Sequence, residues 1–345
     1  MELLVIGGSG YLGRQVTRQA RLAGHSVVAT FRTSMPPEPG VDWHKLDIRS
    51  RDDVRALALR ARPDAIINAA YLQSDWATTA DGGMHVALAA AATGARLVHV
   101  SSDAVFSGIA PSYDESSPPD PVSPYGAAKA AAETAIKGIA PAAVIARTSL
   151  IVGDGDSKHE RFVHALAAGS TSGALFTDEV RCPIHVTDLA AALLEFAAAP
   201  YAGICHAAGA DAISRCELGL LIAARDGLDQ AAIPGAPRAP GTLPHPLDVR
   251  LDSTRTQARL ATRLRGAREF LAPAPSLFCR KPEFRTSQLV FRRRTSAAMA
   301  ATSTGPVVST VISGPMPTGW SYLSIADSGS VPRWTSCLDR ALYRA

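Results

Sequence analysis

The stretch LLVIGGSGYLG, residues 3–13, decides the fold. Its first four residues form an apolar run that ends in β-branched side chains, which is typical of a buried strand. Gly7, Gly10 and Gly13 follow, and a helical pattern then continues to Gly24. In this order, the glycines permit a tight turn and close backbone approach, and the helix start presents free N–H groups to a phosphate. The stretch therefore predicts a dinucleotide-binding unit at the start of the chain.

The alternation of strand and helix patterns continues well beyond this turn. Continuous apolar runs separated by alanine-rich helical segments are typical of a parallel sheet that is covered on both faces. We therefore predict an α/β fold, a Rossmann-type doubly wound parallel sheet with a small C-terminal substrate-binding lobe. A helix whose cap is Thr187 or Asp188 is expected in the second half. The later strands are predicted within residues 26–31, 43–48, 65–71, 96–102, 142–153 and 202–209.

The chain divides by composition into a folded part and a tail. We expect one domain over residues 1–272, in which 1–153 mainly bind the dinucleotide and 154–272 mainly form the substrate lobe. Residues 273–345 are rich in Ser, Thr, Pro and Arg and lack helical periodicity, which predicts disorder. This tail holds nine Lys/Arg and three Asp/Glu, so the other 272 residues carry a balance of −2. The net charge of +4 therefore does not indicate a nucleic-acid-binding protein.

Cysteine usage and hydropathy indicate where in the cell the protein is expected. The five cysteines form no CxxC pair, and the N-terminus reads as a strand rather than as a signal peptide. No apolar run approaches the roughly 20 residues that a membrane span requires. We expect a cytoplasmic protein with no metal, no membrane partner and no nucleic-acid partner.

The residues after the second and third strands bear on cofactor choice. An acidic residue that binds the ribose 2′-OH of NAD usually ends the second strand, and Thr30 takes that place here. Arg32 follows and could meet a 2′-phosphate, so NADPH is preferred to NADH, although Arg32 could equally be a solvated loop charge. Asp47 either accepts a hydrogen bond from the adenine amino group or caps a helix.

The stretch SPYGAAK, residues 123–129, supplies a candidate acid–base pair. Tyr125 and Lys129 are four residues apart, so they lie on one helix face. Pro124 suits the first helical turn, and Ser123 is a plausible cap. Ser102 lies at the carboxyl end of a predicted strand, which is the edge where open parallel sheets bind ligands.

These three side chains suit carbonyl reduction. A tyrosine exchanges its proton poorly at neutral pH because its pKa is about 10, and a neighbouring ammonium lowers that pKa. Tyr125 can then exchange a proton with a carbonyl or hydroxyl oxygen while hydride moves at carbon. Ser102 can donate a hydrogen bond to the same oxygen as charge develops. A bare Tyr-x-x-x-Lys is more often a surface pair, but here it follows a glycine turn and a strand-end serine.

With these motifs the chain resembles an extended short-chain dehydrogenase/reductase of the NAD-dependent epimerase/dehydratase group. Within that group, VHVSSDAVFSG at 98–108 and YGAAKAAAE at 125–133 are similar to the dTDP-4-dehydrorhamnose reductase family, as are RCPIHVTDLA at 181–190 and LDSTR at 251–255. The resemblance covers roughly residues 1–272.

The resemblance implies roles for individual residues. It makes Ser102, Tyr125 and Lys129 catalytic, with Lys129 also holding the nicotinamide ribose. Arg147, which ends a strand, is either a substrate contact or a structural residue that binds a loop carbonyl. The implied substrate-binding residues are Ser102, Asp103, Val105, Phe106 and Arg147. The implied cofactor-binding residues are Gly7, Gly10, Tyr11, Leu12, Gly13, Arg32, Asp47, Ile48, Ala69, Ala70, Tyr71, Tyr125 and Lys129.

The resemblance also implies a reaction. It points to NAD(P)H-dependent reduction of a 4-keto nucleotide sugar, with hydride delivered to C4 and Tyr125 as proton donor. Ala104 replaces the glutamate of a Thr-Asp-Glu triplet found in the related dehydratases, which argues against dehydration. Two alternatives stay open: a nucleotide-sugar 4-epimerase with tightly bound NAD, and a non-catalytic dinucleotide-binding regulatory subunit. The partner is a small-molecule nucleotide sugar, and a homodimer is left open.

Overall fold

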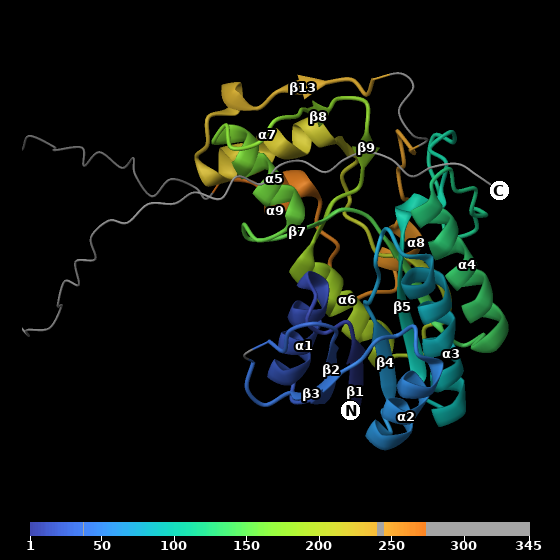
Figure 1. Ribbon diagram of the computed structural model, residues 1–345. Helices are drawn as coiled ribbons and strands as arrows, with labels where there is room; N and C mark the ends of the chain where they lie inside the picture. The colour runs from blue at the N-terminus through green and yellow to red at the C-terminus, as the bar shows by residue number, and fades with distance from the viewer. Residues whose placement is uncertain (37, 240–244, 274–345) are drawn as a thin grey trace, which may run out of the picture. The chain divides into compact units, whose positions relative to one another are not determined.

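The computed structural model describes residues 1–36, 38–239 and 245–273, so the predicted tail lies outside the described residues. In the described part, seven strands form one parallel sheet in the order β11-β6-β5-β4-β1-β2-β3 (Figure 1). This is the Rossmann-type sheet that the sequence predicts. The strands are β1 (Glu2–Ile6), β2 (Ser26–Phe31), β3 (Asp42–Lys45), β4 (Ala65–Asn68), β5 (Arg96–Ser102), β6 (Val144–Thr148) and β11 (Gly203–His206).

The central strand β1 sets the place of the ligand crevice. Leu3 pairs with Val27 of β2 on one side and with Ala65 of β4 on the other. The chain runs outward from β1 to β3, and then returns to continue outward on the opposite side from β4. In open parallel sheets, ligands bind beyond the carboxyl ends of the strands at such a reversal.

Helices cover both faces of the sheet because nearly every side chain of its central strands is apolar. One core packs Val16 and Ala20 of α1 against Leu193 and Phe196 of α6. The opposite core contains Leu57 of α2 and residues of α3 and α4, and Figure 1 shows the two helical layers. The bounds are α1 (Tyr11–Leu22), α6 (Val186–Ala198), α2 (Arg51–Ala61), α3 (Gly82–Thr93) and α4 (Pro124–Ile139).

A smaller lobe packs around a separate apolar cluster. Val163 of α5, Ile222 of α7 and Ala267 of α9 meet in this cluster. Residues 186–206 leave the lobe and return to the large sheet as α6 and β11, so the second half of the domain contributes to both parts. Its elements are α5 (Lys158–Ala167), α7 (Arg215–Asp226), α9 (Ala267–Phe270), β7 (Ile151–Val152), β8 (Leu175–Phe176), β9 (Val180–Arg181), β10 (Ile184–His185), β12 (Ile213–Ser214) and β13 (Gly235–Ala236). The short helix α8 (Thr254–Gln257) lies instead at the end of β11, where the Thr256 hydroxyl accepts a hydrogen bond from the His206 N–H at 3.0 Å.

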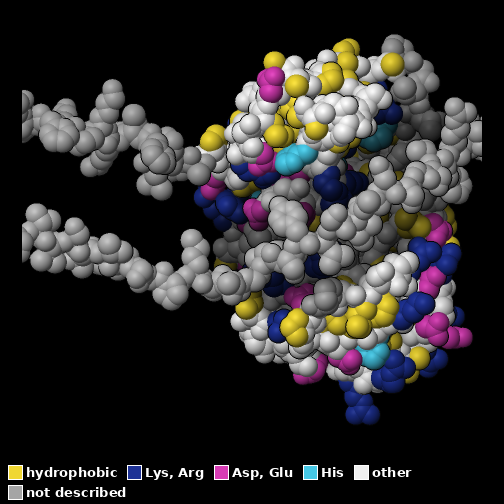
Figure 2. Space-filling view, turned by 60° about the vertical axis from the view of Figure 1, so that its left-hand side comes forward, with side chains coloured by type: hydrophobic (Ala, Val, Ile, Leu, Met, Phe, Trp, Pro, Cys, Tyr) yellow, Lys and Arg dark blue, Asp and Glu magenta, His cyan; other side chains and the backbone are white. Residues whose placement is uncertain are grey.

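Two further observations concern helix ends and the surface. The cap of α6 is His185, whose Nδ1 accepts a hydrogen bond from the Thr187 N–H at 3.3 Å, so the expectation of Thr187 or Asp188 is wrong. Figure 2 shows charged side chains of both signs interspersed on the face that it presents. No helix in the described ranges is long and apolar enough to cross a membrane.

Candidate active site

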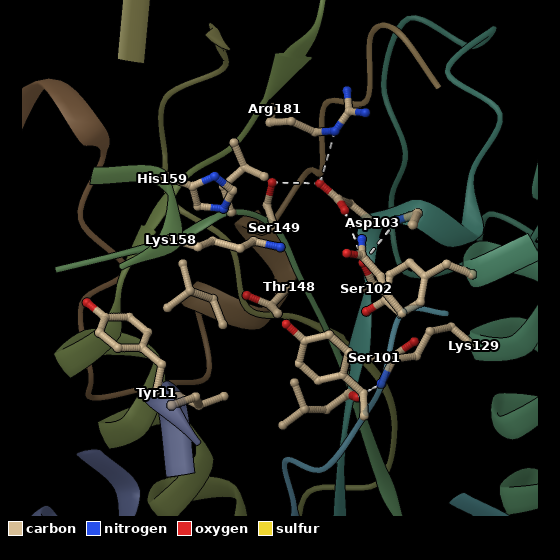
Figure 3. Close-up of a pocket in the computed structure, with 18 of the residues that line it drawn as sticks. Tyr11, Ser101, Ser102, Asp103, Lys129, Thr148, Ser149, Lys158, His159 and Arg181 are labelled. Atoms are coloured by element: carbon tan, nitrogen blue, oxygen red, sulfur yellow. Dashed lines mark hydrogen bonds and ion pairs between the residues drawn. The ribbon is translucent and has the colours of Figure 1, made fainter. Parts of the chain in front are cut away.

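A cavity of about 790 Å³ opens where the strands β1, β4, β5 and β6 end. The glycine turn, the end of β5 and the start of α4 supply one side of its wall, and the smaller lobe supplies the other (Figure 3). Ten of the residues expected in the site line this one cavity. They are Gly10, Tyr11, Leu12, Gly13, Ala69, Tyr71, Ser102, Asp103, Tyr125 and Lys129.

The glycine turn is built so that only glycine fits at two positions. Gly7 has φ of 79°, in the left-handed region that other residues rarely adopt. A Cβ on Gly13 would collide with the carbonyl oxygen of Gly7. Gly10 is the N-cap of α1 and supplies no side-chain cap, so the N–H groups of the first turn stay free, and residues 10–14 line the cavity. The turn therefore forms a cradle for an anion.

The second strand supports this turn from outside the cavity. The hydroxyl of Thr30 accepts a hydrogen bond from the Gly7 N–H at 2.9 Å, and Thr30 is buried. Thr30 is thus engaged with the backbone, while Arg32 is exposed two residues later. The expected cofactor contacts Gly7, Arg32, Asp47, Ile48 and Ala70 do not line the cavity.

Asp47 is held by an arginine and does not cap a helix. Both of its carboxylate oxygens accept hydrogen bonds from Arg49, the shortest at 2.6 Å. These bonds to Arg49 hold the pKa of Asp47 below its usual value, and Arg32 lowers it further. The cap of α2 is Ser50, whose hydroxyl accepts from the Asp53 N–H at 3.3 Å, so the capping alternative for Asp47 is wrong.

Ser102, Tyr125 and Lys129 converge as expected. Ser102 ends β5 and lines the cavity together with Tyr125. The hydroxyl of Ser123 accepts from the Gly126 N–H at 3.1 Å and caps α4, which places Tyr125 in the first turn. One turn later, Nζ of Lys129 donates to the carbonyl oxygen of Val100 at 2.9 Å.

The electrostatics of the pair differ from expectation. Burial raises the pKa of Tyr125 well above its usual value, and the nearby Ser102 hydroxyl opposes this only in part. Burial lowers the pKa of Lys129 to about 8, against the opposing effect of Glu133. The expected lowering of the Tyr125 pKa by Lys129 is therefore not seen. At neutral pH Tyr125 keeps its proton, which suits a proton donor.

Asp103 links the strand end to the smaller lobe. It accepts hydrogen bonds from Ser102 at 3.1 Å and from Ser149 at 2.7 Å. Nε of Arg181 lies 3.5 Å from Oδ2 of Asp103, the oxygen that also accepts from Ser149, and Figure 3 shows these groups around one carboxylate. Asp103 is therefore paired with Arg181 and positioned beside Ser102.

The smaller lobe adds cavity residues that the sequence analysis missed. They include several basic side chains beside the carboxylate of Asp156, and Lys158, which begins α5, projects into the cavity beside Ser149 (Figure 3). Nδ1 of His159 lies 3.1 Å from Nη1 of Arg215, and burial together with this guanidinium holds the pKa of His159 well below its usual value. The missed basic or imidazole residues are Lys158, His159, Arg161, Arg181, Arg215 and His245.

Three expected substrate contacts are buried away from the cavity. Val105 and Phe106 belong to an apolar cluster and are fully buried. Arg147 is 1% exposed and forms a bidentate ion pair with Glu133, at 2.8 and 3.0 Å. Its Nη1 donates to the carbonyl oxygen of Ser117 at 3.1 Å. The structural alternative for Arg147 therefore holds, because none of its donors reaches the cavity.

The doubly wound sheet, the glycine turn and the Ser–Tyr–Lys set define an NAD(P)-dependent oxidoreductase of the short-chain dehydrogenase/reductase superfamily. The profile of the RmlD substrate binding domain family matches residues 1–274. The chain belongs to this family.

Individual relatives agree with this membership. A dTDP-4-dehydrorhamnose reductase of Mycolicibacterium smegmatis is 32% identical over 289 residues, which cover 79% of this chain and 84% of the relative. The crystal structure of a hypothetical dTDP-4-dehydrorhamnose reductase from Sulfolobus tokodaii is 28% identical, with a TM-score of 0.67, and the match covers 77% of this chain and 97% of that one. The dTDP-4-dehydrorhamnose reductase of Bacillus anthracis, solved with NADP, shares the fold at 21% identity and a TM-score of 0.67, covering 78% and 96%.

Proposed function

We propose that this protein reduces the 4-keto group of a nucleotide-linked deoxysugar with NAD(P)H. The observation that carries the proposal is the convergence of Ser102, Tyr125 and Lys129 in a cavity whose opposite wall is basic. Ser102, Tyr125 and Lys129 can bind and protonate a carbonyl oxygen, and the basic wall suits the diphosphate of a nucleotide sugar. Relatives named dTDP-4-dehydrorhamnose reductase support a dTDP-linked substrate.

The cradle at the glycine turn fits a dinucleotide. Gly7, Gly10 and Gly13 would hold the pyrophosphate at the start of α1, where a Cβ on Gly13 would fill the space. The reduced nicotinamide supplies a hydride when it is bound. We favour NADPH, because the buried Thr30 is occupied by the Gly7 N–H and the exposed Arg32 could meet a 2′-phosphate.

Each catalytic side chain has a separate task. Tyr125, which burial keeps protonated, donates its proton to the oxygen that becomes negative during reduction. Ser102 orients that oxygen through its hydroxyl. Lys129 places a positive charge one helical turn away, which stabilises the tyrosinate left after transfer.

The nucleoside end would lie in the smaller lobe. A second cavity of about 260 Å³ shares His159, Arg215 and His245 with the first. Phe162 and Phe176 supply aromatic walls to this second cavity. Flat apolar walls beside a guanidinium suit a nucleobase joined to a diphosphate.

The test follows nicotinamide absorbance after mixing the purified protein with dTDP-4-keto-6-deoxy-L-mannose. NADPH and NADH are used separately. We expect turnover with NADPH that Tyr125→Phe lowers by roughly 10²- to 10⁴-fold. Tyr201→Phe is the matched control, because Tyr201 lies outside the cavity and binds Glu195.

Other results would point elsewhere. Bound cofactor without turnover on this sugar would sink the substrate assignment. Tight retention of NAD together with C4 inversion would favour the epimerase. Cofactor binding without turnover on any keto sugar would favour the regulatory role.

A further inference from the structure

Tyr71 contacts both members of the acid–base pair. Its ring centroid lies 5.9 Å from that of Tyr125, and the two ring planes are inclined by 47°. Nζ of Lys129 lies 5.4 Å from the Tyr71 ring centroid, over the ring face. An aromatic face attracts an ammonium within about 6 Å, and tilted ring pairs at this separation are favourable. The Tyr71 side chain can thus influence both the charge of Lys129 and the position of Tyr125.

The backbone on each side of Tyr71 is fixed by a buried side chain. Oδ1 of Asn68 accepts a hydrogen bond from the Ala70 N–H at 3.1 Å. The hydroxyl of Thr79 accepts from the Leu72 N–H at 3.2 Å and donates to the Leu72 carbonyl oxygen at 2.8 Å. Asn68 and Thr79 are 1% and 2% exposed. Tyr71 is therefore held in place from both neighbours, although its own side chain lines the open cavity.

Lys129 needs such a contact because its ammonium is buried. The residue is 2% exposed, and among the described residues its one hydrogen bond goes to Val100. Glu133, four residues along α4, favours the charged form, but its carboxylate is shared with Arg147 and Ser101. The titratable and charged groups that face Lys129 are Tyr125 and Glu133 on α4, His99 on β5, Tyr71 after β4, and Arg147 on β6 through Glu133.

We propose that Tyr71 is a positioning residue, whose ring face keeps Lys129 charged and whose tilted contact with the Tyr125 ring keeps Tyr125 beside it. The catalytic meaning of this role rests on the proposed function, but the contact and its test do not. The aromatic ring, and not the hydroxyl, makes both contacts. Phenylalanine at position 71 should therefore keep Lys129 charged, whereas an aliphatic side chain of similar bulk should not. Leucine keeps water away from Lys129 and offers no negative π face.

The experiment is a direct titration of Lys129 in the cofactor-free protein. The chain has five lysines, so lysine labelled with ¹³C at Cε gives a simple NMR spectrum, and Lys129→Met identifies the Lys129 signal. We expect Tyr71→Leu to lower the titration midpoint of Lys129 by roughly half to one pH unit. We expect Tyr71→Phe to keep the midpoint of the unmodified protein. Unchanged signals from the other lysines verify that each variant is folded.

Trp76→Leu is the matched control. Trp76 lies on the same segment, is exposed and does not line the cavity, so its loss should leave the Lys129 midpoint in place. An unchanged or raised midpoint in Tyr71→Leu would overturn the proposal, as would an equal shift in Tyr71→Phe or in Trp76→Leu. Because no substrate is added, failure of this test and failure of the proposed reductase activity are separate results.

Discussion

Glu160 and Arg225 form an ion pair at the loop that leads into α5, with Oε1 of Glu160 2.8 Å from Nη2 of Arg225. The same carboxylate accepts hydrogen bonds from the N–H groups of Gly153, Gly155 and Ser157 at 3.2, 2.9 and 2.9 Å. Glu160 is completely buried. This cluster fixes the start of α5, whose first two residues line the cavity.

Removal of this carboxylate should destabilise the protein. We expect Glu160→Ala to lower the free energy of unfolding by about 3 kcal/mol, because buried N–H groups and a guanidinium lose their partner. Glu269→Ala is the control, since Glu269 and Arg263 pair with side chains 42% and 73% exposed, and it should cost less than about 1 kcal/mol. Urea denaturation measures both, and equal losses would contradict the assignment.

Lys129→Met should stabilise the protein at pH 7 and less so at pH 10. Burial lowers the pKa of Lys129 to about 8, below the value of about 10.4 in an unfolded chain. Between these two pKa values the unfolded state binds one more proton than the folded state. The free-energy cost of burying charged Lys129 is therefore fully present below pH 8 and decreases as the pH rises toward about 10.4. The gain at pH 7 has an upper bound of roughly 3 kcal/mol. Denaturation at both pH values measures it, and a pH-independent difference would refute it.

Two glycine substitutions should have opposite effects. Gly13→Ala forces a Cβ onto the Gly7 carbonyl oxygen, so we expect loss of nicotinamide cofactor binding and a lower melting temperature. Gly138→Ala in α4 meets open space, so it should stabilise by roughly 0.5–1 kcal/mol through its better helix propensity. Cofactor fluorescence titration and thermal melting measure these changes. Normal cofactor affinity in Gly13→Ala would be incompatible with the cradle.

Arg32→Ser should reduce cofactor discrimination. A lost contact to a 2′-phosphate should weaken NADPH binding about tenfold, equivalent to about 1.4 kcal/mol, and leave NADH binding nearly unchanged. Arg18→Ser removes an exposed charge on α1 and controls for general electrostatics. Calorimetric titration with both cofactors measures this, and an equal loss for NADPH and NADH would mean that Arg32 does not read the phosphate.

The fold could be predicted because its signals are local. The glycine turn and the apolar strands depend on spacing and burial that the sequence shows directly, and Ser123 with Pro124 marks the start of α4. The cap of α6 was missed because it is the imidazole of His185, which lies outside the usual capping residues. The contacts assigned to cofactor and substrate stay predictions.

The errors in the site come from distant partners. Arg147 lies next to the last residue of β6, beside the crevice, but its guanidinium pairs with Glu133 of α4 in the interior. The Phe106 ring packs against that guanidinium, and Cζ of Arg147 lies 4.9 Å from the Phe106 ring centroid. The basic wall was missed because Lys158, Arg181 and Arg215 are far apart in sequence and meet only through the fold. No local pattern marks such a set.

The late return of the chain to its sheet has a consequence for biosynthesis. β6 forms the edge of the sheet until Gly203–His206 emerges and pairs with it, some 55 residues after β6 ends. In that interval a nascent chain carries an unpaired strand edge, of the kind that templates aggregation. A polypeptide stopped after Gly153 would keep that edge permanently, together with the apolar face that α6 covers. The second half of the chain therefore cannot be cut off without exposing the larger sheet, because α6 and β11 complete that sheet only after the first elements of the smaller lobe have been made.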